Sequence, residues 1–250
     1  MKSLVTIASV VAMFVCTAVP CAAQQEARQF IAALEAYKSG DYPAAVAALE
    51  AIAQSGVRNG ALYYNIGNAH LKNGDLGQAI LWYERSAKLI PGDPDLMFNL
   101  DYTRSLSKDA ADENTLPLMR IFFFWNYQLS SRTIVALAVG GNLLFWGLAA
   151  AMRLTGRRML RRAAIVVLIP SIIFVMTAGF NFYRSANSRH GIILPEKVSI
   201  RSGWEQTSTE LFVLHAGAKV QVVKSATDHL LIQFSKDKIG WVQRNSLGLI

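Results

Sequence analysis

Two long uncharged segments limit what this chain can fold into. Residues 133–152 form a run of twenty residues and residues 163–183 a run of twenty-one, and neither run contains a charged side chain. At 1.5 Å per residue, each run would make a helix about 30 Å long, which matches the hydrocarbon core of a bilayer. Two buried helices of a soluble domain would not require such uninterrupted apolar length. The sequence therefore predicts two transmembrane helices.

The short segment between these runs, residues 153–162, is strongly basic. It carries five arginines and no acidic residue: Arg153, Arg157, Arg158, Arg161 and Arg162. Short basic loops stay on the cytoplasmic side of a membrane, so this segment predicts a cytoplasmic hairpin loop with both flanking regions outside. The formal net charge of the chain is +8, whereas residues 24–116 carry eight basic and twelve acidic residues. The basic balance is therefore chiefly a topology signal and does not favour nucleic-acid binding.

The amino terminus has the pattern of a signal peptide over residues 1–23. A basic second residue and an apolar stretch lead to Cys21-Ala22-Ala23, where small side chains suit signal peptidase. Cleavage there would leave Gln24 first and would remove both cysteines, Cys16 and Cys21, with any disulfide or thiolate chemistry. A lipoprotein anchor and an uncleaved helix are the alternatives. Pro20 disfavours the first, and the short apolar run disfavours the second.

Residues 24–108 contain an internal repeat. A shift of 34 residues aligns small residues with small residues and one Gly-Asp pair with another: Ala33 with Gly67, Gly40 with Gly74, Asp41 with Asp75, and Ala45 with Ala79. This period and these positions resemble the tetratricopeptide repeat, a pair of antiparallel helices. We expect about two and a half repeats, the last a single helix with Asp93 as N-cap and Pro94 at its first position.

The second repeat shows how the helices are expected to pack. Gly67 and Ala79 occupy positions where a missing side chain lets two helices approach. Asp75 is placed to cap the second helix, with Gln78 three residues later, as in a capping box. An array this short is close to the lower limit of stability for stacked repeats. We therefore expect a partner or the membrane to help hold it.

The resemblance also implies a ligand groove on the first helix of each repeat. The corresponding residues, spaced so that each set shares a helical face, are Phe30, Leu34, Tyr37, Tyr64, Asn68, Leu71, Phe98 and Tyr102. A core position remains the alternative for each aromatic residue. Asn68 is different, because an amide among apolar neighbours can hydrogen-bond to an extended peptide backbone.

Residues 109–132 are expected to form a linker and an aromatic segment at the membrane surface. Trp125 and Tyr127 belong to this segment, and such residues gather at membrane–water boundaries. Asn142 and Asn181 are the most deeply placed polar residues, and we expect a hydrogen bond between the two helices there. Neither apolar run has an Asp, Glu, Lys, Arg or His residue, which disfavours an ion or proton path.

The pattern after residue 191 changes to alternation with a period of two. Five runs of β-branched and aromatic residues predict strands over residues 197–201, 211–214, 219–223, 230–234 and 240–242. Short strands with turn residues between them favour a small all-β barrel.

Three ordered motifs in residues 191–250, VSIRSGW, LHAGAKVQVV and IGWVQRNSLGLI, resemble the bacterial SH3-like domain. That resemblance implies an SH3-like barrel in which Trp204 and Trp241 are candidate partner contacts. Some relatives of this domain bind peptidoglycan peptides and many mediate protein contacts, so the fold alone does not decide between them.

No pattern in the chain indicates catalysis. The four histidines, His70, His190, His215 and His229, lack metal-ligand spacing and a paired carboxylate. A nucleophile elbow and a phosphate-binding loop are also missing from the sequence. We therefore expect no metal, no cofactor and no catalytic residue, and we disfavour an enzyme.

The order of these segments resembles the aerotolerance-operon BatE family over essentially the whole chain. The resemblance implies a multidomain membrane protein: a tetratricopeptide array, two transmembrane helices and a C-terminal SH3-like barrel, with both domains periplasmic and the hairpin in the bacterial inner membrane. It also implies partners, namely von Willebrand A-domain membrane proteins and a MoxR-type ATPase, in stress tolerance or aerotolerance.

From the sequence we expect a scaffold or adaptor that binds envelope proteins through the repeat groove and the barrel. The lipid bilayer is its other partner, and no nucleic acid is involved. The alternative is an envelope sensor or a peptidoglycan-binding module that uses the SH3-like domain.

Overall fold

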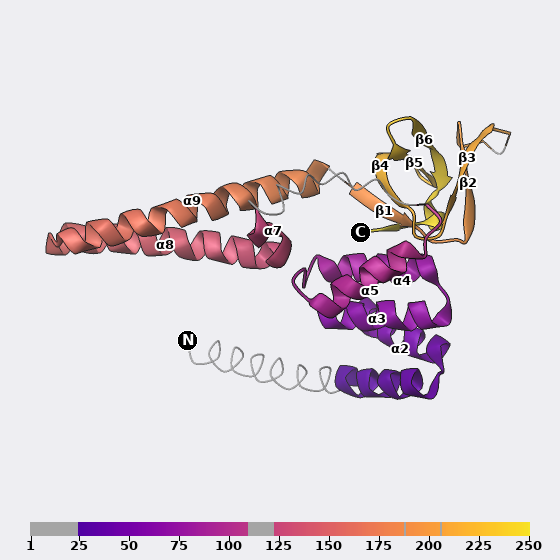
Figure 1. Cartoon of the computed structure of the whole chain (residues 1–250), viewed down its shortest axis with the longest axis horizontal. Helices are drawn as coiled ribbons and strands as arrows, with labels where there is room; N and C mark the ends of the chain where they lie inside the picture. The colour runs from indigo at the N-terminus through magenta and orange to yellow at the C-terminus, as the bar shows by residue number, and fades with distance from the viewer. Residues whose placement is uncertain (1–24, 110–122, 188, 206) are drawn as a thin grey trace, which may run out of the picture.

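The computed structural model describes residues 25–109, 123–187, 189–205 and 207–250. The predicted signal peptide, residues 1–23, and most of the predicted linker over 109–132 lie outside the described residues. The described chain forms a stack of short helices, a hairpin of two long helices and an antiparallel sheet (Figure 1).

The helical stack occupies the first part of the chain. A helix over residues 25–39 precedes four others: α2 (Tyr42–Gln54), α3 (Gly60–Asn73), α4 (Leu76–Ala87) and α5 (Pro94–Ser105). Asp93 caps α5 as predicted, because its Oδ1 accepts the Leu96 amide at 2.9 Å and Pro94 takes the first position. Asp75 precedes α4, but its side chain makes no cap hydrogen bond. The predicted capping box is therefore wrong.

Asp75 uses its carboxylate elsewhere. Its Oδ2 accepts the Asn73 Nδ2 amide at 2.6 Å and lies 3.2 Å from Nδ1 of His70.

The helices α3 and α4 approach closely at Gly67, as predicted, and the group that faces Gly67 is an aromatic ring. A Cβ built on Gly67 would lie 2.5 Å from Cδ1 of Tyr83, so only glycine leaves room for this fully buried ring. Tyr83 thus fills the space that Gly67 provides between α3 and α4.

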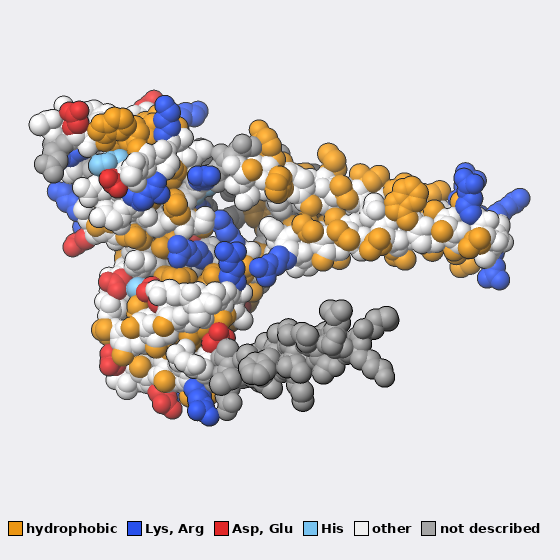
Figure 2. Space-filling model, turned by 180° about the vertical axis from the view of Figure 1, so that it is seen from behind, with side chains coloured by type: hydrophobic (Ala, Val, Ile, Leu, Met, Phe, Trp, Pro, Cys, Tyr) orange, Lys and Arg blue, Asp and Glu red, His pale blue; other side chains and the backbone are white. Residues whose placement is uncertain are grey.

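The hairpin consists of α8 (Ser131–Thr155) and α9 (Arg158–Asn187). These helices contain both predicted apolar runs, and both are long and apolar enough to cross a membrane. Hydrophobic side chains cover the visible face of the hairpin, and cationic side chains gather at its free end (Figure 2). The predicted loop arginines fall at this turn: Arg153 in α8, Arg157 between the helices, and Arg158, Arg161 and Arg162 in α9.

The hairpin register excludes the predicted Asn142–Asn181 hydrogen bond. A Cβ on Gly141 would lie 3.2 Å from Cβ of Ser171, so Asn142 lies about 15 Å along the antiparallel helices from Asn181. Asn181 instead donates to Oδ1 of Asn126 at 2.7 Å. Asn126 belongs to the short helix α7 (Phe124–Gln128), which therefore packs on α9 near the open end of the hairpin.

The C-terminal part is a seven-stranded antiparallel sheet. Its strands are β1 (Arg189–Ile193), β2 (Lys197–Arg201), β3 (Glu210–His215), β4 (Lys219–Ser225), β5 (His229–Ser235), β6 (Lys238–Gln243) and β7 (Leu247–Leu249). The five predicted strands are confirmed as β2 to β6, and β1 and β7 were missed. The order is β3-β2-β6-β5-β4-β1-β7, and β3 and β7 do not pair within the described residues. The sheet is therefore open, where the sequence predicted a small SH3-like barrel.

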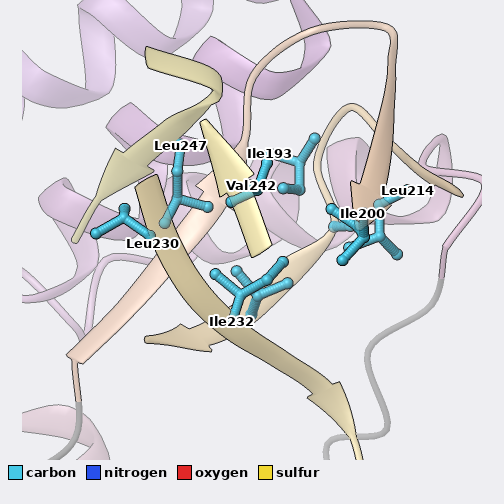
Figure 3. Packing of buried hydrophobic residues seen from close by; sticks show 9 residues of the cluster. Ile193, Ile200, Leu214, Leu230, Ile232, Val242 and Leu247 are labelled. Carbon is cyan, nitrogen blue, oxygen red and sulfur yellow. The ribbon is translucent and has the colours of Figure 1, made fainter. Parts of the chain in front are cut away.

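One hydrophobic core fills the concave side of this sheet (Figure 3). Side chains from all seven strands, and from the turn before β4, contribute to it: Ile193, Ile200, Leu214, Ala218, Val220, Leu230, Ile232, Val242 and Leu247. The alternation of these residues with exposed ones explains why the strands were visible in the sequence. Strand β1 was missed because Arg189 and His190 interrupt the pattern, and β7 because it has only three residues.

The sheet packs directly on the helical stack. Ile192 of β1 is fully buried in the same cluster as Ile80, Leu81 and Tyr83 of α4. A Cβ on Gly77 would lie 2.6 Å from the carbonyl oxygens of Ile193 and Leu194, so the strand backbone lies against α4. The sheet therefore supports the short array from within the chain.

Candidate partner-binding surfaces

The repeat symmetry explains where the sheet docks. Glu50 lies 3.1 Å from Nε2 of His70 and accepts Nε1 of Trp82 at 3.2 Å. Thirty-four residues later, Glu84 pairs with Arg104 at 2.5 Å. Glu50–His70 and Glu84–Arg104 are thus the same contact in successive repeats.

Glu84 has a second partner that comes from the sheet. Lys219 Nζ donates to Oε1 of Glu84 at 3.0 Å, in the role that Trp82 has toward Glu50. Burial raises the pKa of Glu84, but the charges of Lys219 and Arg104 outweigh burial, so its pKa is lowered. The sheet therefore occupies the side of α4 that a further repeat would cover, and the buried carboxylate is ionised and paired there.

The segment that leaves the array is also fixed to the sheet. Ser107 Oγ donates to the carbonyl oxygen of Ala216 at 2.9 Å, and Asp109 Oδ2 accepts the amide of His215 at 2.6 Å. Arg85 of α4 donates from Nε and Nη2 to the carbonyl oxygen of Leu249, the shorter bond being 2.9 Å. The array and the sheet are therefore joined by buried apolar contacts and by hydrogen bonds at several points.

The predicted groove contains a hydrogen-bonded group of four side chains. Oδ1 of Asn68 accepts Tyr83 Oη at 2.6 Å and Asn99 Nδ2 at 3.1 Å. Asn99 Nδ2 also donates to Tyr64 Oη at 2.8 Å. Both hydrogen bonds to Asn68 use its oxygen, which fixes the orientation of the amide. Its Nδ2 makes no hydrogen bond with a described residue and is not fully buried.

The remaining predicted groove residues divide into two groups. Phe30, Tyr37 and Leu71 are partly buried against the repeat cores, and Leu34 is partly buried as well. Phe98 and Tyr102 of α5 are 72% and 52% exposed, which is unusual for aromatic side chains on one helical face. The structure thus brings Tyr64 and Asn68 together, places two exposed aromatic rings on α5, and gives Phe30 and Leu71 core contacts.

The two predicted tryptophans of the sheet lie together. The ring centroids of Trp204 and Trp241 are 5.4 Å apart with an edge-to-face arrangement, and Trp204 is 56% exposed. Both line a surface hollow of about 420 Å³, with Arg201, His229 and Gln243. An exposed aromatic pair beside polar groups can hold a ligand with an apolar face and hydrogen-bonding edges.

Two features of the described residues were not visible in the sequence. His70 is buried between the Glu50 and Asp75 carboxylates, because long-range packing brings α2 beside α3. A second hollow at the end of the array collects basic residues that are separate in sequence. Among the described residues, no group of three or more His, Cys, Asp or Glu side chains could hold a metal ion.

Comparisons with known proteins support the repeat prediction. Residues 32–94 match the model of the tetratricopeptide repeat family, which confirms the 34-residue period for that part of the chain. No curated protein matches the chain. The fold and this match define a protein with a tetratricopeptide array, a module that generally binds protein partners through extended surfaces.

Proposed function

We propose that this protein is a membrane-anchored adaptor. Its repeat groove binds an extended segment of an envelope protein, the α8–α9 hairpin holds it in the inner membrane, and the sheet provides a second contact. Both the array and the sheet lie on the periplasmic side. The protein is not an enzyme and carries no cofactor.

The observation that carries this proposal is the fixed amide of Asn68. Tyr83 and Asn99 hold its oxygen, so its Nδ2 donor keeps one direction before any ligand arrives. An extended peptide has unpaired carbonyl groups that such a donor can bind. Phe98 and Tyr102, both exposed, offer aromatic surface for the side chains of the same segment.

The adaptor need not bind tightly at either site. Two weak sites on one anchor raise the effective concentration of each partner segment at the other site. The docked sheet keeps the groove and the Trp204–Trp241 pair in one unit, since α4 contacts β1 and β7. Following the BatE resemblance, the partners would be von Willebrand A-domain membrane proteins and a MoxR-type ATPase system, in a complex for stress or aerotolerance.

The test is photo-crosslinking in the native membrane. A photoreactive residue replaces Tyr102, and the captured partner is compared with and without Asn68→Asp, which keeps an oxygen acceptor but removes the amide donor. We expect the partner yield to fall about five-fold in Asn68→Asp, the effect of one lost hydrogen bond. A photoreactive residue at Ala47, exposed on α2, is the matched control and should not capture that partner. An equal yield of the captured partner with and without Asn68→Asp would contradict binding in the groove.

A second candidate function is an envelope sensor or a cell-wall-binding module. The observation that favours it is the exposed Trp204 beside Trp241 and the polar lining of their hollow. It rests on the SH3-like resemblance of residues 191–250. Full-length protein should then bind purified peptidoglycan, and Trp204→Ala should abolish that binding. Equal sedimentation of the wild type with and without peptidoglycan rejects this function.

A further inference from the structure

A basic hollow lies at one end of the helical array. It has a volume of about 520 Å³, and three cationic side chains line it: Arg58, Arg85 and Lys88. The other named side chains of its wall are uncharged and include the rings of Tyr63 and Trp82 and the aliphatic Leu89. No described residue of the lining has an acidic side chain. A hollow of this composition is complementary to an anion that also has an apolar part.

Carboxylates of the described residues act on these cations only from beyond ion-pair distance: Glu50 on Arg85 and Glu84 on Lys88. Within the described part of the chain, Arg58, Arg85 and Lys88 form no ion pair. Burial lowers the pKa of Lys88, and the neighbouring charges of Lys219 and Arg85 lower it further, against the opposite effect of Glu84. The charges of Lys219 and Arg85 thus repel the charge of Lys88, and a bound anion would offset this repulsion.

Arg85 is held in place while it faces the hollow. Its guanidinium stacks over the Trp82 ring at 4.7 Å from the centroid and is anchored on the Leu249 carbonyl oxygen. Arg58 and Lys88 are exposed, so both side chains are accessible to a ligand from solvent. The site therefore combines one preorganised cation with two exposed ones.

The hollow lies at the end of the array that meets the hairpin. Ile90 packs against Gly60. Two residues after Ile90, the chain lies against α7, because a Cβ on Gly92 would lie 2.9 Å from the carbonyl oxygen of Gln128. Helix α7 in turn packs on α9 through the Trp125–Thr177 and Asn126–Asn181 hydrogen bonds. Lys and Arg side chains gather where the hairpin meets the two domains (Figure 2). The hollow is thus beside the boundary of the membrane that the hairpin would enter.

We propose that the hollow formed by Arg58, Arg85 and Lys88 binds the phosphate group of an anionic phospholipid in the outer leaflet around the hairpin. This inference rests on the proposed membrane anchorage. The cations meet the phosphate, and Tyr63 and Trp82 contact the glycerol and upper acyl region, where aromatic rings are favoured. Such a contact fixes the height and tilt of the array above the bilayer, and hence the direction in which the groove faces.

A lipid accounts for the site better than an acidic peptide does. The hollow adjoins the base of the hairpin through α7, so lipid headgroups are present there at high local concentration. A soluble acidic peptide gains no such proximity. Free phosphate shares the headgroup chemistry, so the experiment must distinguish it from the lipid.

The experiment uses the full chain in nanodiscs of phosphatidylcholine, with and without phosphatidylglycerol. Hydrogen exchange is followed in residues 84–92. We expect phosphatidylglycerol to slow exchange there in the wild type. Each lost cation should weaken lipid binding about five-fold, so the protection should vanish in the double variant Arg58→Gln/Lys88→Gln. Lys88→Arg keeps the charge and should keep the protection.

Two controls make the result specific. Arg157→Gln/Arg158→Gln removes two cations at the hairpin turn, where anionic lipid also gathers, and should leave residues 84–92 protected. Inorganic phosphate added to phosphatidylcholine discs should give no protection. Protection by phosphate, protection only by an added acidic peptide, or a phosphatidylglycerol effect that survives Arg58→Gln/Lys88→Gln overturns the proposal. Failure of the chain to enter the discs would instead contradict the membrane anchorage.

Discussion

Replacing Lys219 by methionine should loosen the sheet from the array. Lys219 Nζ lies 3.0 Å from Oε1 of Glu84, whose side chain is only 10% exposed. At an effective dielectric constant near 20, two unit charges at that distance attract by about 5 kcal/mol. Desolvation offsets much of this attraction, and breaking a buried pair costs about 3–5 kcal/mol. Since Glu84 keeps Arg104, we expect Lys219→Met to cost about 2 kcal/mol.

The assay is hydrogen exchange of α4 and β1 in the full chain in detergent. A loss of about 2 kcal/mol raises exchange through local opening by about 30-fold. Lys224→Met, at an exposed position of the same strand, is the control and should change nothing. In a double-mutant cycle with Glu84→Gln, the two changes should be non-additive, because both remove the Lys219–Glu84 pair. Additive effects, or unchanged exchange in α4, would refute the ion pair as a stabilising contact between the array and the sheet.

Other predictions concern the array and its groove. Gly67→Ala should lower the midpoint of thermal unfolding, with a cost of about 2–3 kcal/mol, since the new methyl group overlaps the Tyr83 ring. Tyr83→Phe should cost about 1 kcal/mol by the same measurement and leave the Asn68 oxygen held by Asn99 alone. The hydrogen bond from His70 lowers the pKa of Glu50, although burial opposes it. The contribution of Glu50 to folding stability is therefore fully present above the ordinary carboxyl pKa of 4.5. It is lost as the pH falls through the lower pKa that Glu50 has in the folded protein. Acid titration followed by circular dichroism should show this loss in the wild type and less of it in Glu50→Gln.

Local patterns predicted most of the secondary structure. The 34-residue period, the Asp93-Pro94 start and the uncharged runs each depend on neighbouring residues, and the structure contains the corresponding helices. The alternation in β2 to β6 was visible for the same reason. The strands β1 and β7 lack such a pattern, because Arg189 and His190 interrupt β1 and β7 has only three residues, and both are held by pairing with other strands.

Contacts between distant segments could not be predicted. Nothing near Lys219 in the sequence indicates that it pairs with Glu84, which is 135 residues away. The docking of the sheet on α4 and the fixed amide of Asn68 both depend on such contacts. The 34-residue period could have revealed one of them, because it aligns Glu84 and Arg104 with Glu50 and His70.

The most direct test of the central claim is the membrane side of each part of the chain. Single cysteines replace Ala51, Thr155 and Thr227, all exposed, in a chain whose Cys16 and Cys21 are serine. Intact inner-membrane spheroplasts are treated with an impermeant thiol reagent. If the docked array and the sheet lie on one side of the membrane above a two-helix anchor, residues 51 and 227 should be labelled in intact spheroplasts. Residue 155 should be labelled only after lysis. Labelling at 155 in intact cells, or at only one of the other two positions, would contradict it.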